Sequence, residues 1–151
     1  MTTATLAPPR ADAPPRFEQE IGDVLAMFAA PGAAIEAHGI SPQLFHLVKL
    51  RASQLNRCAH CVMMHTREAR EDGETSERLD RLVVWDHVKD FTPAERTALA
   101  WTEALTVFDN DRALGPLRAE LRAHFSEEQI AALTAGVALI NLWNRIGVSR
   151  H

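Results

Sequence analysis

Three segments of the chain begin with residue patterns that favour the N-terminus of an α-helix, and these patterns restrict the fold more than any other feature. Ser41-Pro42 supplies a capping hydroxyl followed by a proline at the first helical position. Thr92 with Glu95, and Ser126 with Gln129, match the capping box, in which two side chains satisfy free backbone N–H groups. The sequence therefore predicts helices that begin close to residues 42, 93 and 127. The last of these is apolar almost all round, which is typical of a central, buried helix.

Helical periodicity and stop signals account for most of the remaining chain. Residues 17–30 place apolar side chains on one face, and Pro31-Gly32 is expected to end this helix. Asn56 is expected to cap a further helix beside the cysteines, and Gly73 stands where that helix should stop. No run of alternating β-branched residues competes with this pattern. The sequence predicts an all-α fold, built as a single-domain bundle.

Composition narrows the class of protein. The 151 residues suffice for one domain, and 46% hydrophobic with 24% charged residues is ordinary for a soluble globular protein. A net charge of -4 gives no reason to expect nucleic acid or an anionic membrane as a partner. The most apolar stretch, Ile130–Trp143, is too short to span a bilayer. Half of the 8 prolines lie before residue 17, so residues 1–16 are expected to form a flexible or extended arm and residues 17–151 the helical domain.

The chain has 2 cysteines, Cys58 and Cys61, in a CxxC motif. Without an apolar signal segment at the N-terminus, the expected compartment is a reducing cytoplasm, where such a pair is catalytic or metal-binding more often than structural. On a helix that begins near Asn56, Cys58, Cys61 and His65 share one face. A thiol in the first turn is acidified by the helix N-terminus, and His65 can relay a proton. These are the parts of a dithiol–disulfide catalyst.

The CxxC motif also fits two roles outside redox catalysis. Two small apolar residues three apart on a helix can simply belong to the core. Zinc is the sharper alternative, because Cys58, Cys61 and His65 can supply three ligands, with His46 or His60 as the fourth. Covalent haem is excluded, because it needs a histidine directly after the second cysteine, where Val62 stands. We predict no metal and no cofactor.

Two more histidines surround the motif. His60 lies between the cysteines but is turned away from their face, which indicates a solvent-facing or interface position. His46 lies on the preceding helix among leucine and valine residues, which favours a half-buried core histidine. If the two helices fold back on each other, His46 faces the thiols.

The segments "LVKLRASQLNRCAHCVMMHTREARE", "FTPAERTALAWTEALT" and "FSEEQIAALTAGVALINLWNRIGV" resemble the AhpD-like branch of the carboxymuconolactone decarboxylase family. The resemblance implies an all-helical fold that assembles into homotrimers or homohexamers, with thiol-dependent peroxidase or disulfide reductase activity. The family motif matches at Cys58, His60, Cys61 and His65, and its proton-relay glutamate falls on His46. The decarboxylase branch generally lacks the cysteine pair, so the pair argues against a lactone substrate.

Two conclusions about function follow as expectations. The first is an enzyme that reduces organic hydroperoxides and is recycled by a dithiol, either a lipoyl-bearing protein or a thioredoxin-like protein. Helix electrostatics favour Cys58 as the more acidic thiol, whereas the family comparison favours Cys61 as the attacking one, and we expect Cys61. The second is a redox-sensing or scaffold oligomer in which the pair oxidises without productive turnover.

Overall fold

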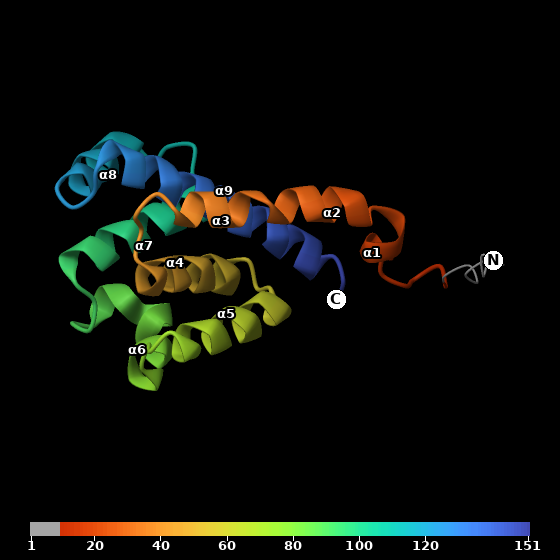
Figure 1. Ribbon diagram of the computed structural model, residues 1–151. Helices are drawn as coiled ribbons and strands as arrows, with labels where there is room; N and C mark the ends of the chain where they lie inside the picture. Colours follow the sequence, from red (N-terminus) through yellow and green to blue (C-terminus); the bar gives the residue numbers. More distant parts are fainter. Residues whose placement is uncertain (1–9) are drawn as a thin grey trace.

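The computed structural model describes residues 10–151, and within this range the secondary structure is entirely helical (Figure 1). The predicted all-α, single-domain fold is confirmed. The helices are α1 (Phe17–Glu20), α2 (Gly22–Ala29), α3 (Pro31–Glu36), α4 (Pro42–Leu55), α5 (Ala59–Glu71), α6 (Ser76–Arg81), the 3₁₀ helix η1 (Leu82–His87), α7 (Pro93–Thr106), α8 (Leu114–Arg122) and α9 (Glu127–Val148).

The N-terminal region departs from the prediction of one helix over residues 17–30. Ile21 leaves helical geometry, with φ −137° and ψ 34°, and so separates α1 from α2. Helix α2 ends at Ala29, just before Pro31-Gly32 as predicted. Pro31 also opens α3, because proline is tolerated at the first helical position and Ala30 keeps helical φ and ψ. The helices α1–α3 contain no buried residue and form a strip that runs beside α9 (Figure 1). The predicted arm lies partly outside the described residues, and residues 10–16 form no helix.

Helix α4 is the centre of the bundle because it is buried on two sides. Leu44, Phe45 and Val48 face one apolar cluster, which includes Trp101 and is completed by α8 and α9. Leu47 and Leu50 face a second cluster, completed by α5, α6, η1 and α7. Helix α4 is thus anchored by two clusters, and α5 packs against it. The turn between α4 and α5 is therefore fixed by packing at both of its ends.

Helix α9 is apolar almost all round, a pattern that predicts a central, buried helix, and the structure shows a central helix of which one face is buried and another lines a cavity. One face of α9, with Leu133, Val137 and Ile140, is buried in the bundle. Leu139, Trp143 and Ile146, on another face, line a cavity. Among residues 10–151, α9 is the one helix long and apolar enough to cross a membrane, but it packs against α3, α4, α5, α7 and α8 as a core helix does.

The turn between α4 and α5 contains the one non-glycine residue of the described chain with positive φ, Arg57 (φ 57°). The N–H of Cys58 donates to Ser53 O and that of Arg57 to Gln54 O, each at 3.1 Å, which is the Schellman pattern of a helix end. Asn56 therefore ends α4, and the prediction that it caps the next helix is wrong. Cys58 is the N-cap instead, since its Sγ accepts a hydrogen bond from the N–H of Cys61 at 3.3 Å.

We expect Arg57→Gly to stabilise the protein by up to about 1 kcal/mol, because glycine adopts the left-handed conformation without the steric cost that a Cβ brings. Urea denaturation measures this change. Arg57→Ala is the control for loss of the side chain and should give no gain. A destabilised glycine variant would mean that the arginine side chain, and not the backbone conformation, decides stability at this turn.

Candidate active site

The two cysteines lie together at the start of α5 and are joined by a disulfide. Cys58 caps the helix and is fully buried, with no exposed surface, whereas Cys61 lies in the first turn with 3% exposed and lines a cavity. A Cβ placed on Gly147 of α9 would lie 2.6 Å from Cys58 Sγ and 3.3 Å from Cys61 Sγ. Glycine is therefore required where α9 crosses the sulfurs, and the backbone of α9 covers Cys58.

His65 follows Cys61 by one helical turn and is held by a neighbouring carboxylate. Its Nδ1 lies 2.8 Å from Glu68 Oε2, and the ring is 5% exposed. Burial lowers the pKa of His65 below its ordinary value; Glu68 opposes this shift, and the positive charge of Lys49 adds to it. An ionised Glu68 only accepts hydrogen bonds, so it fixes the proton of His65 on Nδ1 and leaves Nε2 as the basic nitrogen.

Two imidazole nitrogens, His65 Nε2 and His46 Nδ1, are the buried side-chain polar atoms of residues 10–151 that have no hydrogen-bond partner. Such atoms are rare in folded proteins and often mark catalytic or ligand-binding positions. His65 lines the same cavity as Cys61. Its Nε2 is buried without a hydrogen-bond partner in the described residues.

His46 and His60 take different places from His65. His46 is 9% exposed, and its Nε2 lies 2.6 Å from Oδ2 of Asp72, the residue that ends α5. It lines a second cavity of about 240 Å³ rather than the one that Cys61 lines. His60 is exposed and lines the rim of the larger cavity. The larger cavity is thus lined by Cys61, His65 and His60, but not by Cys58, which is bonded to Cys61. His46 lines the smaller cavity.

A buried polar network lies beneath the cysteine turn. Asn56 Nδ2 donates to Asn141 Oδ1 and to Asn144 Oδ1, each at 2.9 Å, and Asn144 Nδ2 donates to Ser53 Oγ at 3.0 Å. Asn141 Nδ2 also donates to Thr106 Oγ1 at 3.0 Å. The network ties the turn that carries Cys58 to α9. The residues that the network joins across this turn lie 85 or more positions apart along the chain. The one sign of the network in the sequence was therefore that Asn141 and Asn144 are polar residues within the apolar helix α9.

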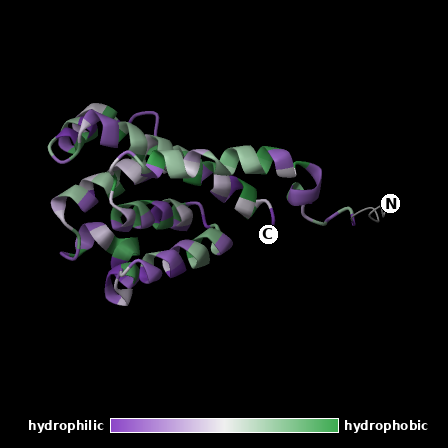
Figure 2. Ribbon diagram, in the orientation of Figure 1, coloured by the Kyte–Doolittle hydropathy of each residue, from purple (hydrophilic) through white to green (hydrophobic). Residues whose placement is uncertain are grey.

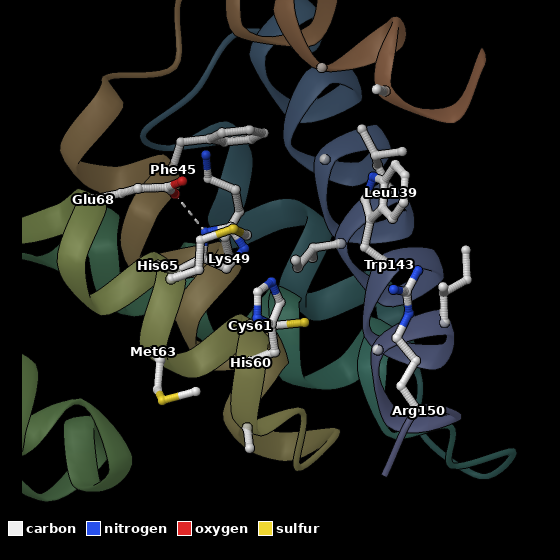
Figure 3. A pocket seen from close by; sticks show the side chains of 18 of the residues that line it. Phe45, Lys49, His60, Cys61, Met63, His65, Glu68, Leu139, Trp143 and Arg150 are labelled. Carbon is white, nitrogen blue, oxygen red and sulfur yellow. Dashed lines mark hydrogen bonds and ion pairs between the residues drawn. The ribbon is translucent and has the colours of Figure 1, made fainter. Parts of the chain in front are cut away.

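The cavity beside Cys61 has a volume of about 930 Å³ and lies between α4, α5, α9 and the α1–α3 strip (Figure 3). In Figure 3, Cys61 points across it toward α9, which contributes Leu139 and Trp143. Lys49 and Arg150 also line it, and each is paired with a glutamate, Lys49 with Glu36 at 3.4 Å and Arg150 with Glu18 at 2.7 Å. The sequence did not predict these charged residues as part of the site.

The positions of the two sulfurs and of His46 do not match those of zinc ligands. The two sulfurs are bonded to each other, and His46 is engaged with Asp72. Across the described part of the chain, no three His, Cys, Asp or Glu side chains are grouped as a metal site requires. The arrangement instead offers a bonded sulfur pair, a buried imidazole with a carboxylate partner, and a cavity with a mainly apolar lining.

Comparison with known proteins places this chain in a family. The model of the carboxymuconolactone decarboxylase family matches residues 22–104, which contain both cysteines, His65 and Glu68. The chain belongs to this family. It is 39% identical over 103 residues to the uncharacterised protein YdfG of Bacillus subtilis, a match that covers 68% of this chain and 70% of YdfG. It is 31% identical over 103 residues to the uncharacterised protein YnjA of Escherichia coli, covering 68% of this chain and 56% of YnjA.

Solved structures support the AhpD-like branch. A crystal structure of an Agrobacterium tumefaciens protein of unknown function, described as a candidate antioxidant defence protein AhpD, is 33% identical with a TM-score of 0.86. The alignment covers 92% of this chain and 95% of that protein. The debrominase Bmp8 is 20% identical with a TM-score of 0.76, covering 87% of this chain and 71% of that one, and it shares the fold.

Proposed function

We propose that this protein is a thiol peroxidase that reduces organic hydroperoxides through Cys58 and Cys61. The observation that carries the proposal is the position of the pair: a disulfide between residues three apart, with Cys61 on the wall of a large cavity beside His65. The AhpD-like relative, described as a candidate in antioxidant defence, supports the same class of chemistry.

Cys61 is the attacking residue in this proposal. In the reduced protein, His65 Nε2 takes the thiol proton, and the Cys61 thiolate attacks the O–O bond of the hydroperoxide. The S–O bond forms, the O–O bond breaks, and the leaving alkoxide takes a proton to become an alcohol. Cys61 becomes a sulfenic acid. Cys58 is excluded from this step because α9 covers it, although the helix N-terminus favours its thiolate.

Cys58 resolves the intermediate. Its sulfur displaces water from the sulfenic acid and forms the disulfide seen in the structure. An external dithiol, lipoyl-bearing or thioredoxin-like, then attacks Cys61 and expels Cys58 as a thiolate at the N-cap of α5, and a second attack releases the oxidised donor. A leaving thiolate stabilised by a helix N-terminus leaves faster, so the acidity of Cys58 serves this step. Such a cycle fits a reducing cytoplasm.

Glu68, rather than His46, takes the part of the family's relay glutamate in this proposal. Glu68 contacts the base directly, whereas His46 lines a different cavity and is bound to Asp72. The side chain of Glu68 is 34% exposed, so it also connects the buried imidazole to solvent for proton exchange. His46 contributes to the link between α4 and the end of α5.

We expect the acidic limb of kcat/KM against pH to lie below the ordinary histidine pKa of 6.5, because burial lowers the pKa of His65 and only the neutral ring accepts a proton. Glu68→Gln removes the charge that raises this pKa, so the limb should move to still lower pH, with a plateau reduced roughly tenfold. Glu71→Gln, on the same helix but paired with Arg67, is the matched control and should leave the profile unchanged. A limb that stays in place, or moves to higher pH, would contradict the role of Glu68.

The α1–α3 strip supports assembly of the chain into an oligomer, for which the family resemblance implies a homotrimer or homohexamer. In Figure 2 the α2–α3 part of the strip is predominantly hydrophobic, yet none of its residues is buried within the protomer. Met27 is 72% exposed. Contact with another subunit would remove this apolar surface from water. Sedimentation equilibrium of the purified protein measures the state.

The proposed function is tested by steady-state turnover of cumene hydroperoxide with dihydrolipoamide or reduced thioredoxin as the dithiol donor. The wild-type protein should consume peroxide and donor in equal amounts. The alternative, a redox-sensing oligomer, would form the disulfide once and then stop. A single stoichiometric burst without turnover with either donor would therefore reject the enzyme in favour of the sensor.

A further inference from the structure

The cavity beside Cys61 extends along α9, and the positions of two α9 glycines that line it give a minimum length. A Cβ on Gly136 would meet the ring of Phe45 at 2.3 Å, and a Cβ on Gly147 would meet Cys58 Sγ at 2.6 Å and Cys61 Sγ at 3.3 Å. Both glycines line the cavity. They lie 11 positions apart, which corresponds to about 16 Å of helix. An extended chain advances about 1.2 Å per backbone bond, so roughly a dozen carbon–carbon bonds cover this span.

The wall along this span is apolar. The α9 side is lined by Leu139, Ile140, Trp143 and Ile146, and the α5 side by Met63 and Met64. Unbranched methionines adapt to flexible apolar ligands. A volume of about 930 Å³ is that of a site for a drug-sized or lipid-sized ligand, far more than a four-carbon hydroperoxide occupies.

A positive charge stands at the Phe45 end of this wall. The Nζ of Lys49 lies 5.0 Å from the centroid of the Phe45 ring, and only 17% of the lysine side chain is exposed. Its acidic partner is Glu36, at 3.4 Å, whose side chain is 55% exposed. Glu36 can turn outward into solvent and leave the ammonium to an incoming carboxylate. Arg150 is engaged more fully, by Glu18 at 2.7 Å and by the ring of Phe17 at 4.9 Å.

We infer that the cavity binds long-chain aliphatic carboxylates, with the carboxylate on Lys49 and the chain along α9 toward Cys61. Resting on the proposed function, this inference names the substrate class: a hydroperoxide of a long-chain fatty acid, whose apolar chain packs on the wall along α9 while its O–O group reaches Cys61. A shorter hydroperoxide fills one end of the cavity only, and a neutral one leaves Lys49 without the ligand's charge.

The binding step is tested on the oxidised protein, in which the sulfurs cannot react with peroxide. Dodecanoate and tetradecanoate, below their micelle concentrations, should change the tryptophan fluorescence of the wild type with saturation. Trp143→Phe should lose this change, since Trp143 lines the cavity and Trp85 and Trp101 lie in the core. Dodecanol and butanoate should each bind at least roughly tenfold more weakly than dodecanoate, because a charge-assisted contact or the apolar chain is missing.

Lys49→Met keeps the length of the stem and removes the charge, so it should weaken dodecanoate binding roughly tenfold and leave dodecanol binding unchanged. Lys89→Met is the matched control, because Lys89 is the other lysine of the chain, exposed and outside the cavity. Lys49→Arg should restore most of the affinity. Equal affinity for dodecanoate and dodecanol, an unchanged Kd in Lys49→Met, or a fluorescence change that persists in Trp143→Phe would each overturn the inference.

Turnover separates this inference from the proposed function. A long-chain hydroperoxy acid should show a kcat/KM at least roughly tenfold above that of its methyl ester and of tert-butyl hydroperoxide, and Lys49→Met should remove the preference. Turnover of tert-butyl hydroperoxide with no preference for the acid would reject the substrate class and keep the peroxidase. Saturable, Lys49-dependent dodecanoate binding without turnover of any peroxide would reject the peroxidase and keep the binding site.

Discussion

Replacement of Cys61 by serine is expected to reduce hydroperoxide turnover to the uncatalysed background. A serine hydroxyl does not ionise near neutral pH and cannot attack the O–O bond as a thiolate does. Cys58 cannot take over, because it is fully buried beneath the backbone of α9. Peroxide consumption and dithiol oxidation should both stop, with a loss of at least roughly a thousandfold in kcat/KM, within the range that loss of a catalytic nucleophile produces.

Cys58→Ser gives the complementary result and separates the two sulfurs. This variant should still react once with peroxide and hold a sulfenic acid on Cys61, which a dimedone-type reagent traps and mass spectrometry locates. Steady-state turnover through the internal disulfide should be lost. Trapping of a sulfenic acid on Cys58 in the Cys61→Ser variant would reverse the assignment. In that case, helix electrostatics would outweigh access to the cavity.

The second large effect is expected on stability. Asn144 is fully buried, accepts a hydrogen bond from Asn56 and donates one to Ser53. Asn144→Ala leaves polar groups of the cysteine turn without partners in the interior, which costs about 2–3 kcal/mol of the free energy of unfolding. For a chain of this length that corresponds to a fall of about 4–12 °C in Tm. Calorimetry and urea denaturation of the oxidised protein measure both quantities.

Asn110→Ala is the matched control, since Asn110 is exposed in the loop between α7 and α8, and it should leave Tm within about 1 °C. The double variant Asn56→Ala/Asn144→Ala should lose less stability than the two single changes together, because the second change removes a group that the first has already left unpaired. Strict additivity would mean that the hydrogen bonds between these residues do not stabilise the turn.

The helical elements could be predicted from the sequence where the signal was local. Ser41, Thr92 and Ser126 act as N-caps as predicted, and the last two form complete capping boxes. Capping depends on residues within one turn of each other, so these caps can be predicted from a short stretch of sequence. The pairing of Cys58 with Cys61 and the contact of His65 with Glu68 also lie within a turn of α5. The contact of His65 with Glu68 could have been predicted from the i, i+3 spacing of the two residues, although the sequence analysis did not single out Glu68.

Features that join distant segments could be established only from the packing of the folded chain. The sequence left His46 open as a relay residue. In the structure it contacts Asp72, 26 residues away, and lines a different cavity from Cys61. The error at Asn56 has the same origin, because its side chain bonds to Asn141 and Asn144 of α9 instead of capping α5. The cover of Cys58 by Gly147, and the cavity wall along α9, arise only when α9 packs across the hairpin of α4 and α5. Helix periodicity predicts which residues share one face of a helix. Which other helix that face contacts depends on the packing of the whole bundle.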